Sequence, residues 1–404
     1  MESDIMKKEM IIDLQMFTNE FLEMKQIARE LLPILKENLV FPLLVNKNYS
    51  GAYSAARGDT ILVEKPAVFI ADEFSGTINL QDIGEKKVPV KLDKLADVSI
   101  AVSAADFALS SQDFRTKYLE SAATSLAEKI NTDGLELYKD VPSYVGVAGV
   151  TPDALSDIAA ARRVLNVNKV PTSPRNAVWD PYADEKLATL DALTSINKSG
   201  SPMALREGEI GRVHGINSYM SQAVKTHVAG GYTALADVKA AVTFANNATD
   251  SASGFEYSTV VLTSTAGASV AKCLKGDLIN MTDDNGKVYQ VTVLEDSVEA
   301  IAGVVTVKVI GVLEADVTDV AVTFVDVTAG GHVANLAFHP MAFAFVTRPL
   351  DEPRSANSYV VNYDGLSLRV VEGYDVTTKK TTLSMDILYS FKTIYPQLAT
   401  RVLG

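Results

Sequence analysis

The first clear pattern in the chain is a run of apolar residues at helical spacing within residues 17–40. Pro33 interrupts the run, so the pattern predicts either one kinked helix or two short helices. The apolar face of this segment would pack on the protein's own core or dock on a neighbouring subunit, and the sequence leaves both interpretations open. The apolar residues that recur at this spacing of three or four positions are Phe21, Met24, Ile27, Ala28, Leu31, Leu32, Leu35 and Leu39.

A long, polar, extended excursion follows over residues 59–104. GDTILVEKP opens it, and residues 69–87 then hold few apolar side chains. Two long strands joined by such a tip cannot bury the tip within one subunit, because isolated two-stranded ribbons are marginal in water. We therefore expect residues 66–88 to be mobile in a free subunit and covered by another chain after assembly. Apolar and polar residues alternate strictly in the second strand, which places the apolar ones on one face. These residues are Val88, Val90, Leu92, Val98, Ile100 and Val102.

One unusually long helix is predicted over residues 112–138. Ser110, Ser111 and Asp113 supply capping chemistry at its start, and Pro142 marks its end. About 27 residues at ~1.5 Å each give a rod of about 40 Å, with a bend predicted at residues 131–134 (NTDG).

A small α/β body is predicted over residues 141–222. Thr151, Pro152 and Asp153 would open a helix that runs to Leu165. The short buried strand AVWD at 177–180 follows, and a further helix begins at Pro181.

Residues 223–334 have a different, strand-rich and acidic character. They carry 6 Lys, no Arg and 13 Asp or Glu. Their net charge is therefore 6 − 13 = −7, out of −13 for the whole chain. Asn285-Gly286 predicts a two-residue hairpin. We interpret the block as an inserted β-barrel or sandwich that folds autonomously and whose two ends lie close together. Its strand-like runs are STVVLT (258–263), KVYQVTVL (287–294), VVTVKVIGV (304–312) and DVAVTFV (319–325).

The body resumes after residue 334. Asp364-Gly365 predicts a second hairpin, beyond which Leu366, Leu368 and Val370 alternate, and another strand is predicted over residues 377–388.

Composition and charge limit the class of protein. With 404 residues, 47% of them hydrophobic, the chain has room for two or three globular domains. The net charge of −13 argues against nucleic-acid binding, which needs clustered Lys and Arg. The single cysteine, Cys273, excludes an internal disulfide. Residues 1–20 lack the apolar region of a signal peptide, and no stretch approaches the ~18 apolar residues of a membrane span, so a soluble intracellular product is predicted.

The sequence predicts no catalytic residue, no cofactor site and no metal site. The histidines at 214, 227, 332 and 339 lack the spacing of a zinc helix, and HExxH and CxxC are absent. His339 lies in an apolar run and is interpreted as a hydrogen-bonded core histidine. The glycines of GEIGRVHG indicate a turn, and DDNG at 283–286 lacks the ligand spacing of a calcium loop.

Taken in order, the segments resemble the major capsid proteins of tailed bacteriophages with the Hong Kong 97 fold, in the coat-protein subfamily that carries an inserted β-domain. The resemblance rests on GDTILVEKP, VPVKLDKLADVSIAVSAADFALSSQDF, KYLESAATSLAEKI, VPTSPRNAVWDP, EGEIGRVHGINSYMSQAV, NLAFHPMAFAFVTRPL and DILYSFKTIYPQLATRVLG.

The resemblance implies an α+β fold of five parts. Residues 1–58 would form an N-terminal arm and residues 59–100 an extended loop over the adjacent subunit. Residues 101–140 and 351–384 would form a peripheral domain with the long helix as its spine. Residues 141–222, 335–350 and 385–404 would form an axial domain at capsomer centres, and residues 223–334 would be an insertion on the outer surface.

The resemblance also implies the function and the partners. The chain would self-assemble into hexamers and pentamers of an icosahedral capsid that encloses the phage genome without specific DNA binding and without membrane contact. A portal protein and a decoration protein are implied as further partners. Only 58 residues precede the extended loop, which favours a separate scaffolding protein over a fused one. Assembly would take place in the cytoplasm of the host bacterium, and the final location would be the virion.

Three alternatives stay open at this point. An encapsulin-type nanocompartment shares the fold, but the insertion argues against it. A soluble enzyme would need a concave site with paired polar groups, for which there is no motif. The strand-rich residues 223–334 would also suit a β-rich surface protein, although the chain lacks an export signal.

Overall fold

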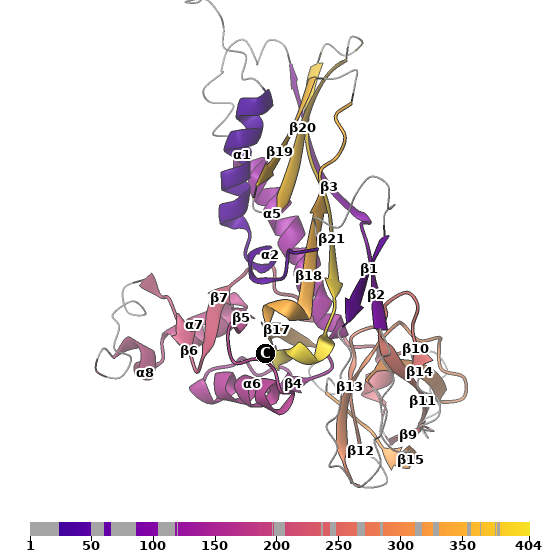
Figure 1. The fold of residues 1–404 in the computed structure, drawn as a ribbon. Helices are drawn as coiled ribbons and strands as arrows, with labels where there is room; N and C mark the ends of the chain where they lie inside the picture. The colour runs from indigo at the N-terminus through magenta and orange to yellow at the C-terminus, as the bar shows by residue number, and fades with distance from the viewer. Residues whose placement is uncertain are drawn as a thin grey trace, which may run out of the picture.

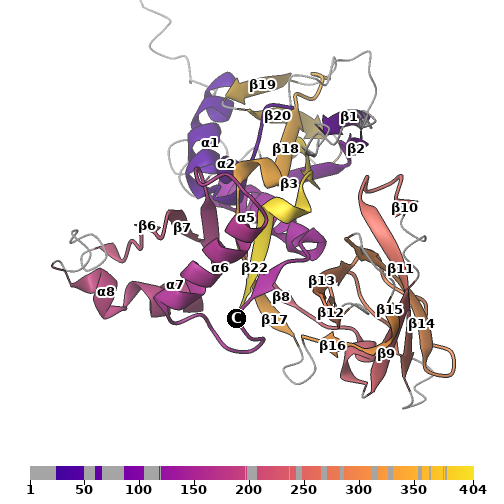
Figure 2. The same ribbon diagram turned by 60° about the horizontal axis from the view of Figure 1, so that its bottom comes forward.

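The computed structural model describes four groups of strands and the helices that cover them (Figure 1). An elongated upper body holds one sheet and two helices, and below it lie a second sheet and a separate strand-rich domain. Figure 2 shows this domain and helices α6 and α7 on opposite sides of strands β17 and β22. The described residues are 24–49, 60–65, 86–103, 118, 120–195, 197, 207–235, 237–242, 248–264, 271–282, 286–311, 317–325, 331–353, 357–363, 365–375, 377 and 380–404.

The N-terminal helix α1 (Met24–Asn38) is one continuous helix with Pro33 inside it, so the alternative of two short helices is wrong. A proline at this point removes one backbone hydrogen bond, and burial of the apolar face offsets that loss. Leu31 and Leu35 are fully buried in the same core as the long helix and the upper sheet. In the described part of this segment the apolar face therefore packs on its own subunit. A short helix α2 (Phe41–Leu44) follows.

The extended excursion forms a ribbon that is shorter than expected. Strand β1 (Thr60–Lys65) pairs with β2 (Lys86–Lys91) in antiparallel register, and residues 66–85 lie outside the described residues. The prediction of one long second strand is wrong, because the chain leaves the ribbon at residues 92–93 and β3 (Lys94–Ser103) joins the upper sheet through β21. Alternation continues across this break, so sequence periodicity alone does not reveal the change of sheet.

The spine is described from residue 120. It forms α5 (Glu120–Leu135) and then a 3₁₀ turn, η4 (Glu136–Asp140). The predicted start at residue 112 lies outside the described residues. The helix continues through the bend predicted at residues 131–134. Gly134 instead allows a close approach, because a Cβ there would lie 2.5 Å from Cδ1 of Phe41.

The upper sheet is a single sheet of five antiparallel strands that lies along the spine. Its order is β18-β21-β20-β19, with β3 also on β21. Tyr363 pairs with Leu366, which confirms the predicted two-residue hairpin at Asp364-Gly365. The strands are β18 (Phe343–Arg348), β19 (Asn357–Tyr363), β20 (Leu366–Asp375) and β21 (Lys380–Thr393).

The lower sheet contains seven strands in the order β4-β22-β17-β5-β7-β6, with β8 paired to β17. The buried strand at AVWD and the helix from Pro181 are confirmed as β5 and α7. The predicted helix start at Thr151 is wrong, because α6 begins at Leu155, where Asp157 accepts hydrogen bonds from the backbone N–H groups of Asp153 and Ala154. The elements are β4 (Tyr144–Val145), α6 (Leu155–Val167), β5 (Asn176–Trp179), α7 (Pro181–Ala188), α8 (Asp191–Thr194), β6 (Arg212–Val213), β7 (Ile216–Met220), β8 (Thr226–His227), β17 (His332–Phe338), η7 (Pro340–Ala342), η8 (Pro396–Leu398) and β22 (Ala399–Leu403).

The strand-rich domain is a nearly closed barrel with its own core, here called the barrel. Its sheet order is β15-β9-β11-β14-β13-β12-β16, and β10 pairs with β11. Thr282 pairs with Val288, so five residues separate the strands, and the predicted two-residue turn at Asn285-Gly286 is wrong. The elements are η5 (Gly231–Ala234), β9 (Val238–Val242), β10 (Ala248–Thr249), β11 (Glu256–Ser264), β12 (Leu278–Thr282), β13 (Val288–Val293), β14 (Val304–Ile310), β15 (Val317–Ala321) and β16 (Thr323–Phe324).

Candidate functional site at the junction of body and barrel

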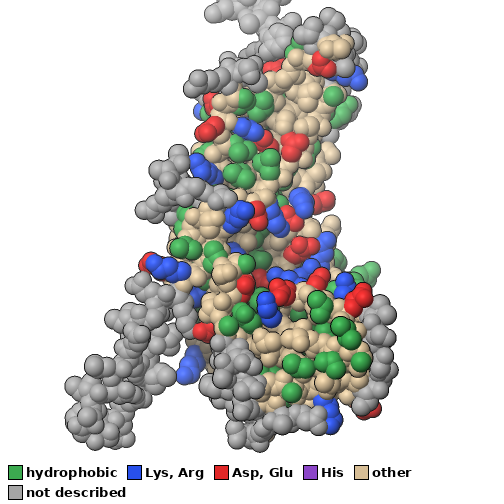
Figure 3. Space-filling view, turned by 90° about the vertical axis from the view of Figure 1, so that its right-hand side faces the viewer, with side chains coloured by type: hydrophobic (Ala, Val, Ile, Leu, Met, Phe, Trp, Pro, Cys, Tyr) green, Lys and Arg blue, Asp and Glu red, His purple; other side chains and the backbone are tan. Residues whose placement is uncertain are grey.

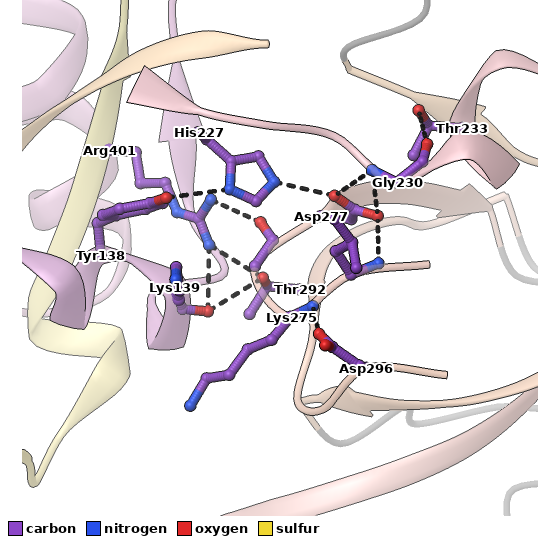
Figure 4. Close-up of polar contacts among 12 residues, drawn as sticks. Tyr138, Lys139, His227, Gly230, Thr233, Lys275, Asp277, Thr292, Asp296 and Arg401 are labelled. Carbon is purple, nitrogen blue, oxygen red and sulfur yellow. Dashed lines mark hydrogen bonds and ion pairs between the residues drawn. The ribbon is translucent and has the colours of Figure 1, made fainter. Parts of the chain in front are cut away.

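The chain enters and leaves the barrel through a pair of strands. His227 at the end of β8 pairs with His332 at the start of β17, and the centroids of their rings lie 5.1 Å apart. The two ends of the insertion are therefore adjacent, as the sequence predicted. This neck borders a buried polar cluster, here called the junction, in which three elements of the body meet the barrel (Figure 4).

Arg401 lies at the centre of the junction and is fully buried. It comes from β22, a strand that is buried along its whole length between β17 and β4. Its Nη1 donates to the carbonyl oxygen of Gly276 at 2.7 Å, and its Nη2 donates to Oγ1 of Thr292 at 2.9 Å. Its Nε donates to the carbonyl oxygen of Val141 at 2.9 Å. A buried guanidinium is tolerated only when its N–H groups are satisfied, and here both body and barrel supply the acceptors.

His227 connects the two sides a second time. Its Nδ1 lies 3.1 Å from the hydroxyl of Tyr138, and its Nε2 lies 2.9 Å from Oδ1 of Asp277. The Asp277 carboxylate also accepts from the backbone N–H groups of Leu274, at 2.8 Å, and Gly230, at 3.2 Å. Because Asp277 faces His227 as an acceptor that already takes two backbone N–H groups, we assign the Nε2 proton to His227, so that its Nδ1 accepts from Tyr138.

Two glycines permit this close contact. A Cβ on Gly230 would lie 2.4 Å from the carbonyl oxygen of Lys272 and 2.8 Å from Oδ2 of Asp277. Gly276 has a φ of +100°, and a Cβ there would lie 2.9 Å from Cγ of Lys139. A side chain at Gly276 would push the barrel away from the body, whereas one at Gly230 would clash inside the barrel and displace the Asp277 carboxylate that contacts His227.

The rim of the junction carries further links. Lys275 Nζ lies 2.9 Å from Oδ1 of Asp140, whose other oxygen accepts from Oγ1 of Thr393 at 2.9 Å. Asn280 of the barrel donates to the hydroxyl of Tyr144 at 2.6 Å. The side-chain amide of Gln290 accepts from the backbone N–H of Tyr144 at 3.3 Å and donates to its carbonyl oxygen at 3.4 Å. The barrel therefore turns polar side chains of β12 and β13 toward the body.

The base of the ribbon also contacts the barrel. A Cβ on Gly254 would lie 2.9 Å from Cα of Val88, and Lys65 Nζ lies 5.7 Å from the ring centroid of Phe255. Lys392 of β21 donates to the carbonyl oxygen of Ala252 at 3.3 Å. Burial lowers the pKa of the Lys392 ammonium, against the opposing attraction of Asp140. Ribbon, upper sheet and barrel thus meet at one place.

The junction is arranged for orientation. Its charged and hydrogen-bonding groups point at one another and at backbone carbonyls, and they fix the barrel on the body. Within the described ranges, no group of three or more His, Cys, Asp or Glu side chains could hold a metal ion. None of the helices described above is both long and apolar enough to cross a membrane.

The histidines singled out in the sequence have separate positions. His339 is buried and accepts a hydrogen bond from the backbone N–H of Met341, which confirms the core interpretation; burial lowers its pKa, with a smaller contribution from Arg175. His214 occupies the β6–β7 turn predicted from GEIGRVHG. The junction was not predicted from the sequence. The available signal was a charged residue, Arg401, inside the apolar tail ATRVLG.

Comparisons with known proteins bear on this architecture. The chain is 22% identical over 420 residues to a "Major capsid protein" of Acyrthosiphon pisum secondary endosymbiont phage 1, covering 94% of this chain and 97% of that protein. It is similar in fold to a chain in a structure of Mycobacterium phage Che8, with a TM-score of 0.50, 15% identity and 90% of each chain covered. A chain in the capsid structure of Cyanophage P-SCSP1u has a TM-score of 0.44 at 11% identity, with 87% of this chain and 84% of that chain covered.

Together with a match to a coat-protein family model, the shared fold defines the class as an α+β capsid fold of the Hong Kong 97 type. The family model described as P22 coat protein, gene protein 5, matches residues 16–403, and the chain belongs to this family. The resemblance predicted from the sequence is therefore confirmed, and the function is that of a phage coat protein that forms the capsid shell. The encapsulin, enzyme and surface-protein alternatives are not favoured.

Proposed function

We propose that the chain assembles into hexameric and pentameric capsomers of an icosahedral shell that encloses the phage genome. In this proposal the α1 segment belongs to an N-terminal arm, and the ribbon of each subunit extends over its neighbour. The upper sheet with α5 forms the peripheral domain, the lower sheet forms the axial domain near the capsomer centre, and the barrel projects outward.

The observation that carries the proposal is the two-sided character of the ribbon. One face, with Val63, Val88 and Val90, is buried in a small core against the body. On the other face Leu62 is 58% exposed, directly opposite Pro89 in the register. Complete burial of an exposed leucine contributes about 1.5–3 kcal/mol, and covering the exposed part of Leu62 would contribute roughly half of that. A neighbouring subunit that covers this face would supply that burial.

Partners and location complete the proposal. A shell built from hexamers and pentamers of a single chain needs its curvature to be set as the shell grows. A separate scaffolding protein would set that curvature. A portal protein would occupy one vertex, and a decoration protein would bind outside. The net charge of −13 fits a shell that encloses DNA without binding it tightly. Assembly would occur in the cytoplasm of the host bacterium, and the protein would have no enzymatic role.

The test is sedimentation velocity and light scattering of the purified chain above micromolar concentration, with and without scaffolding protein. We expect fast-sedimenting shells from the unmodified chain and small, folded subunits from Leu62→Glu. Val288→Glu, at a barrel position that is 62% exposed, is the matched control and should assemble normally. An unmodified chain that stays monomeric in every condition would contradict the proposal, and so would normal assembly of Leu62→Glu.

A further inference from the structure

The barrel has two unlike outer surfaces. The side formed by β12 and β13 faces its own body and carries polar side chains, including Asn280, Gln290 and Thr292. The opposite side, formed by β9, β11 and β14, faces away from the body. A barrel that only decorated its own subunit would have the reverse arrangement, with apolar side chains toward the body and charged ones toward solvent.

Alternation along the three outer strands defines which side chains face outward. On β11, Val260 and Leu262 are buried in the barrel core, so Val261 between them points outward. The register places Val261 between Ala241 of β9 and Thr306 of β14. The next row of the sheet joins Thr263 to Val304. We call this surface the outer sheet face; its uncharged members are Ala241, Tyr257, Thr259, Val261, Thr263, Val304 and Thr306.

Charge is nearly absent from the outer sheet face, although the domain as a whole is acidic. Residues 223–334 carry 6 − 13 = −7, yet across β9, β11 and β14, all of which are described, the outward charged side chains are Lys239 and Lys308. They lie at opposite corners, and Lys308 is ion-paired with Glu295 at 2.8 Å. Figure 3 views this side of the molecule and shows hydrophobic and uncharged side chains across the lower domain, with most charges near its upper border.

A rigid apolar turn extends this face at one end. Ile301 and Val304 exchange backbone hydrogen bonds around Ala302 and Gly303, which have φ values of +52° and +78°. Turns of this kind usually hold Asn, Asp or Gly, whereas here Ile301 is 80% exposed and Val304 is 43% exposed. The hydroxyl of buried Tyr232 donates to the carbonyl oxygen of Gly303 at 2.7 Å, which holds the turn in place.

We propose that the outer sheet face, with the Ile301 turn, is a docking surface for a second copy of this chain in the assembled shell. The inference rests on the proposed function and names one contact within it. Two acidic domains repel each other wherever carboxylates face carboxylates. The outward side chains of β9, β11 and β14 include no carboxylate, so this is the side of the barrel that the acidic surface of another copy can approach with least repulsion.

The size of the face fits a contact that acts only in an assembly. Three strands about 4.8 Å apart and about six residues long give a face of roughly 300 Å². Stable pairs of proteins bury about 800 Å² on each partner. The contact is therefore too small to hold two free subunits together, and it contributes when other interfaces already hold the copies in place.

The test is the rate of alkylation by N-ethylmaleimide at an introduced cysteine, in free subunits and in shells. The variant is Thr306→Cys, and the matched control is Val288→Cys, which lies on β13 of the same barrel. The native Cys273 is fully buried and gives little background. Shells are prepared with about one variant subunit in ten, so that wild-type copies carry the assembly. We expect labelling of Thr306→Cys to slow at least tenfold in shells, while Val288→Cys reacts at similar rates in both states.

The outcomes separate this inference from the proposed function. Shells in which Thr306→Cys reacts as fast as in free subunits overturn the docking face and leave the shell function standing. Thr306→Cys could instead be protected from alkylation only after a second protein is added to complete shells. That result overturns the choice of a second copy of this chain as the occupant. Failure of the unmodified chain to form any shell overturns the proposed function and the docking face together.

Discussion

Arg401 donates a hydrogen bond of 2.7 Å to the carbonyl oxygen of Gly276, and this contact joins the last strand of the body to the barrel. The two residues are 125 positions apart in the chain. Since β22 also pairs with β17 and β4, the position of the barrel depends on the strand that completes the lower sheet. The orientation of the barrel is thus set by tertiary packing as well as by the covalent neck.

Replacing Arg401 should loosen the barrel. Arg401→Met keeps much of the buried volume but leaves the carbonyl oxygens of Val141 and Gly276 without a donor, at about 1–3 kcal/mol each. We expect the free energy of unfolding to fall by about 2–5 kcal/mol, measured by chemical denaturation. Arg163→Met, at an exposed position on α6, is the control and should change stability by less than about 0.5 kcal/mol. Equal stability of the two variants would show that the junction is not a structural link.

Gly134→Ala should destabilise the protein although it raises helix propensity. Alanine favours a helix by about 1 kcal/mol over glycine, but its Cβ would lie 2.5 Å from Cδ1 of Phe41. Phe41 is fully buried against other aromatic rings and has no room to move. Overpacking of this kind costs about 1–3 kcal/mol, so a net loss in thermal stability is expected. In Gly373→Ala, where a Cβ meets nothing within 4 Å, no such loss should occur.

Asp133 should make stability depend on pH in the acid range. Burial alone would raise the pKa of its carboxyl group, but hydrogen bonds from Tyr389, at 2.6 Å, and Lys129, at 3.0 Å, outweigh burial and lower it. A pKa below the unfolded value of about 3.9 contributes stability above that pH, and the contribution is lost as pH falls through the folded pKa. Asp133→Asn should therefore lower stability at pH 7 by about 1–2 kcal/mol.

The pH profile is the deciding measurement for Asp133. The difference between Asp133→Asn and the unmodified chain should shrink as the pH is lowered below about 4, because the native carboxyl group then becomes protonated as well. Urea denaturation from pH 7 to pH 3 gives this profile. A difference that stays constant over the range would mean that the carboxylate charge is not what stabilises the site.

The barrel expressed alone, as residues 223–334, should fold cooperatively. Its core residues come from within this segment, including Tyr232, Leu262, Val307 and Phe324. The fragment loses the contacts of Tyr138 and Arg401, so a lower melting temperature than in the full chain is expected. Calorimetry and amide resonances give the answer, and a disordered fragment would mean that the barrel depends on the body.

Local signals in the sequence predicted elements well where a single segment decides the structure. Trp179 and its neighbours form the buried strand, and Asp364-Gly365 forms the tight hairpin. Two signals failed. Asp157, a competing cap within the same segment, moves the start of α6 away from Thr151. The alternation through residues 88–102 hides the point at which the chain changes sheets.

The junction was beyond prediction from the sequence because its residues are far apart in the chain. His227 and Asp277 are 50 positions apart, and Tyr138 is 89 positions from His227. In the sequence each of these three side chains is an isolated polar residue, and only the fold brings them together. The domain boundaries drawn from the resemblance remain predictions, and β21 (Lys380–Thr393) crosses the one placed at residue 384.

Electron microscopy of the purified chain in negative stain is the most direct test of shell formation. We expect closed shells of uniform diameter, formed by the chain alone or with a scaffolding protein, with barrel-sized protrusions on the outer surface. Discrete small particles under every condition, from a chain that circular dichroism shows to be folded, would contradict it.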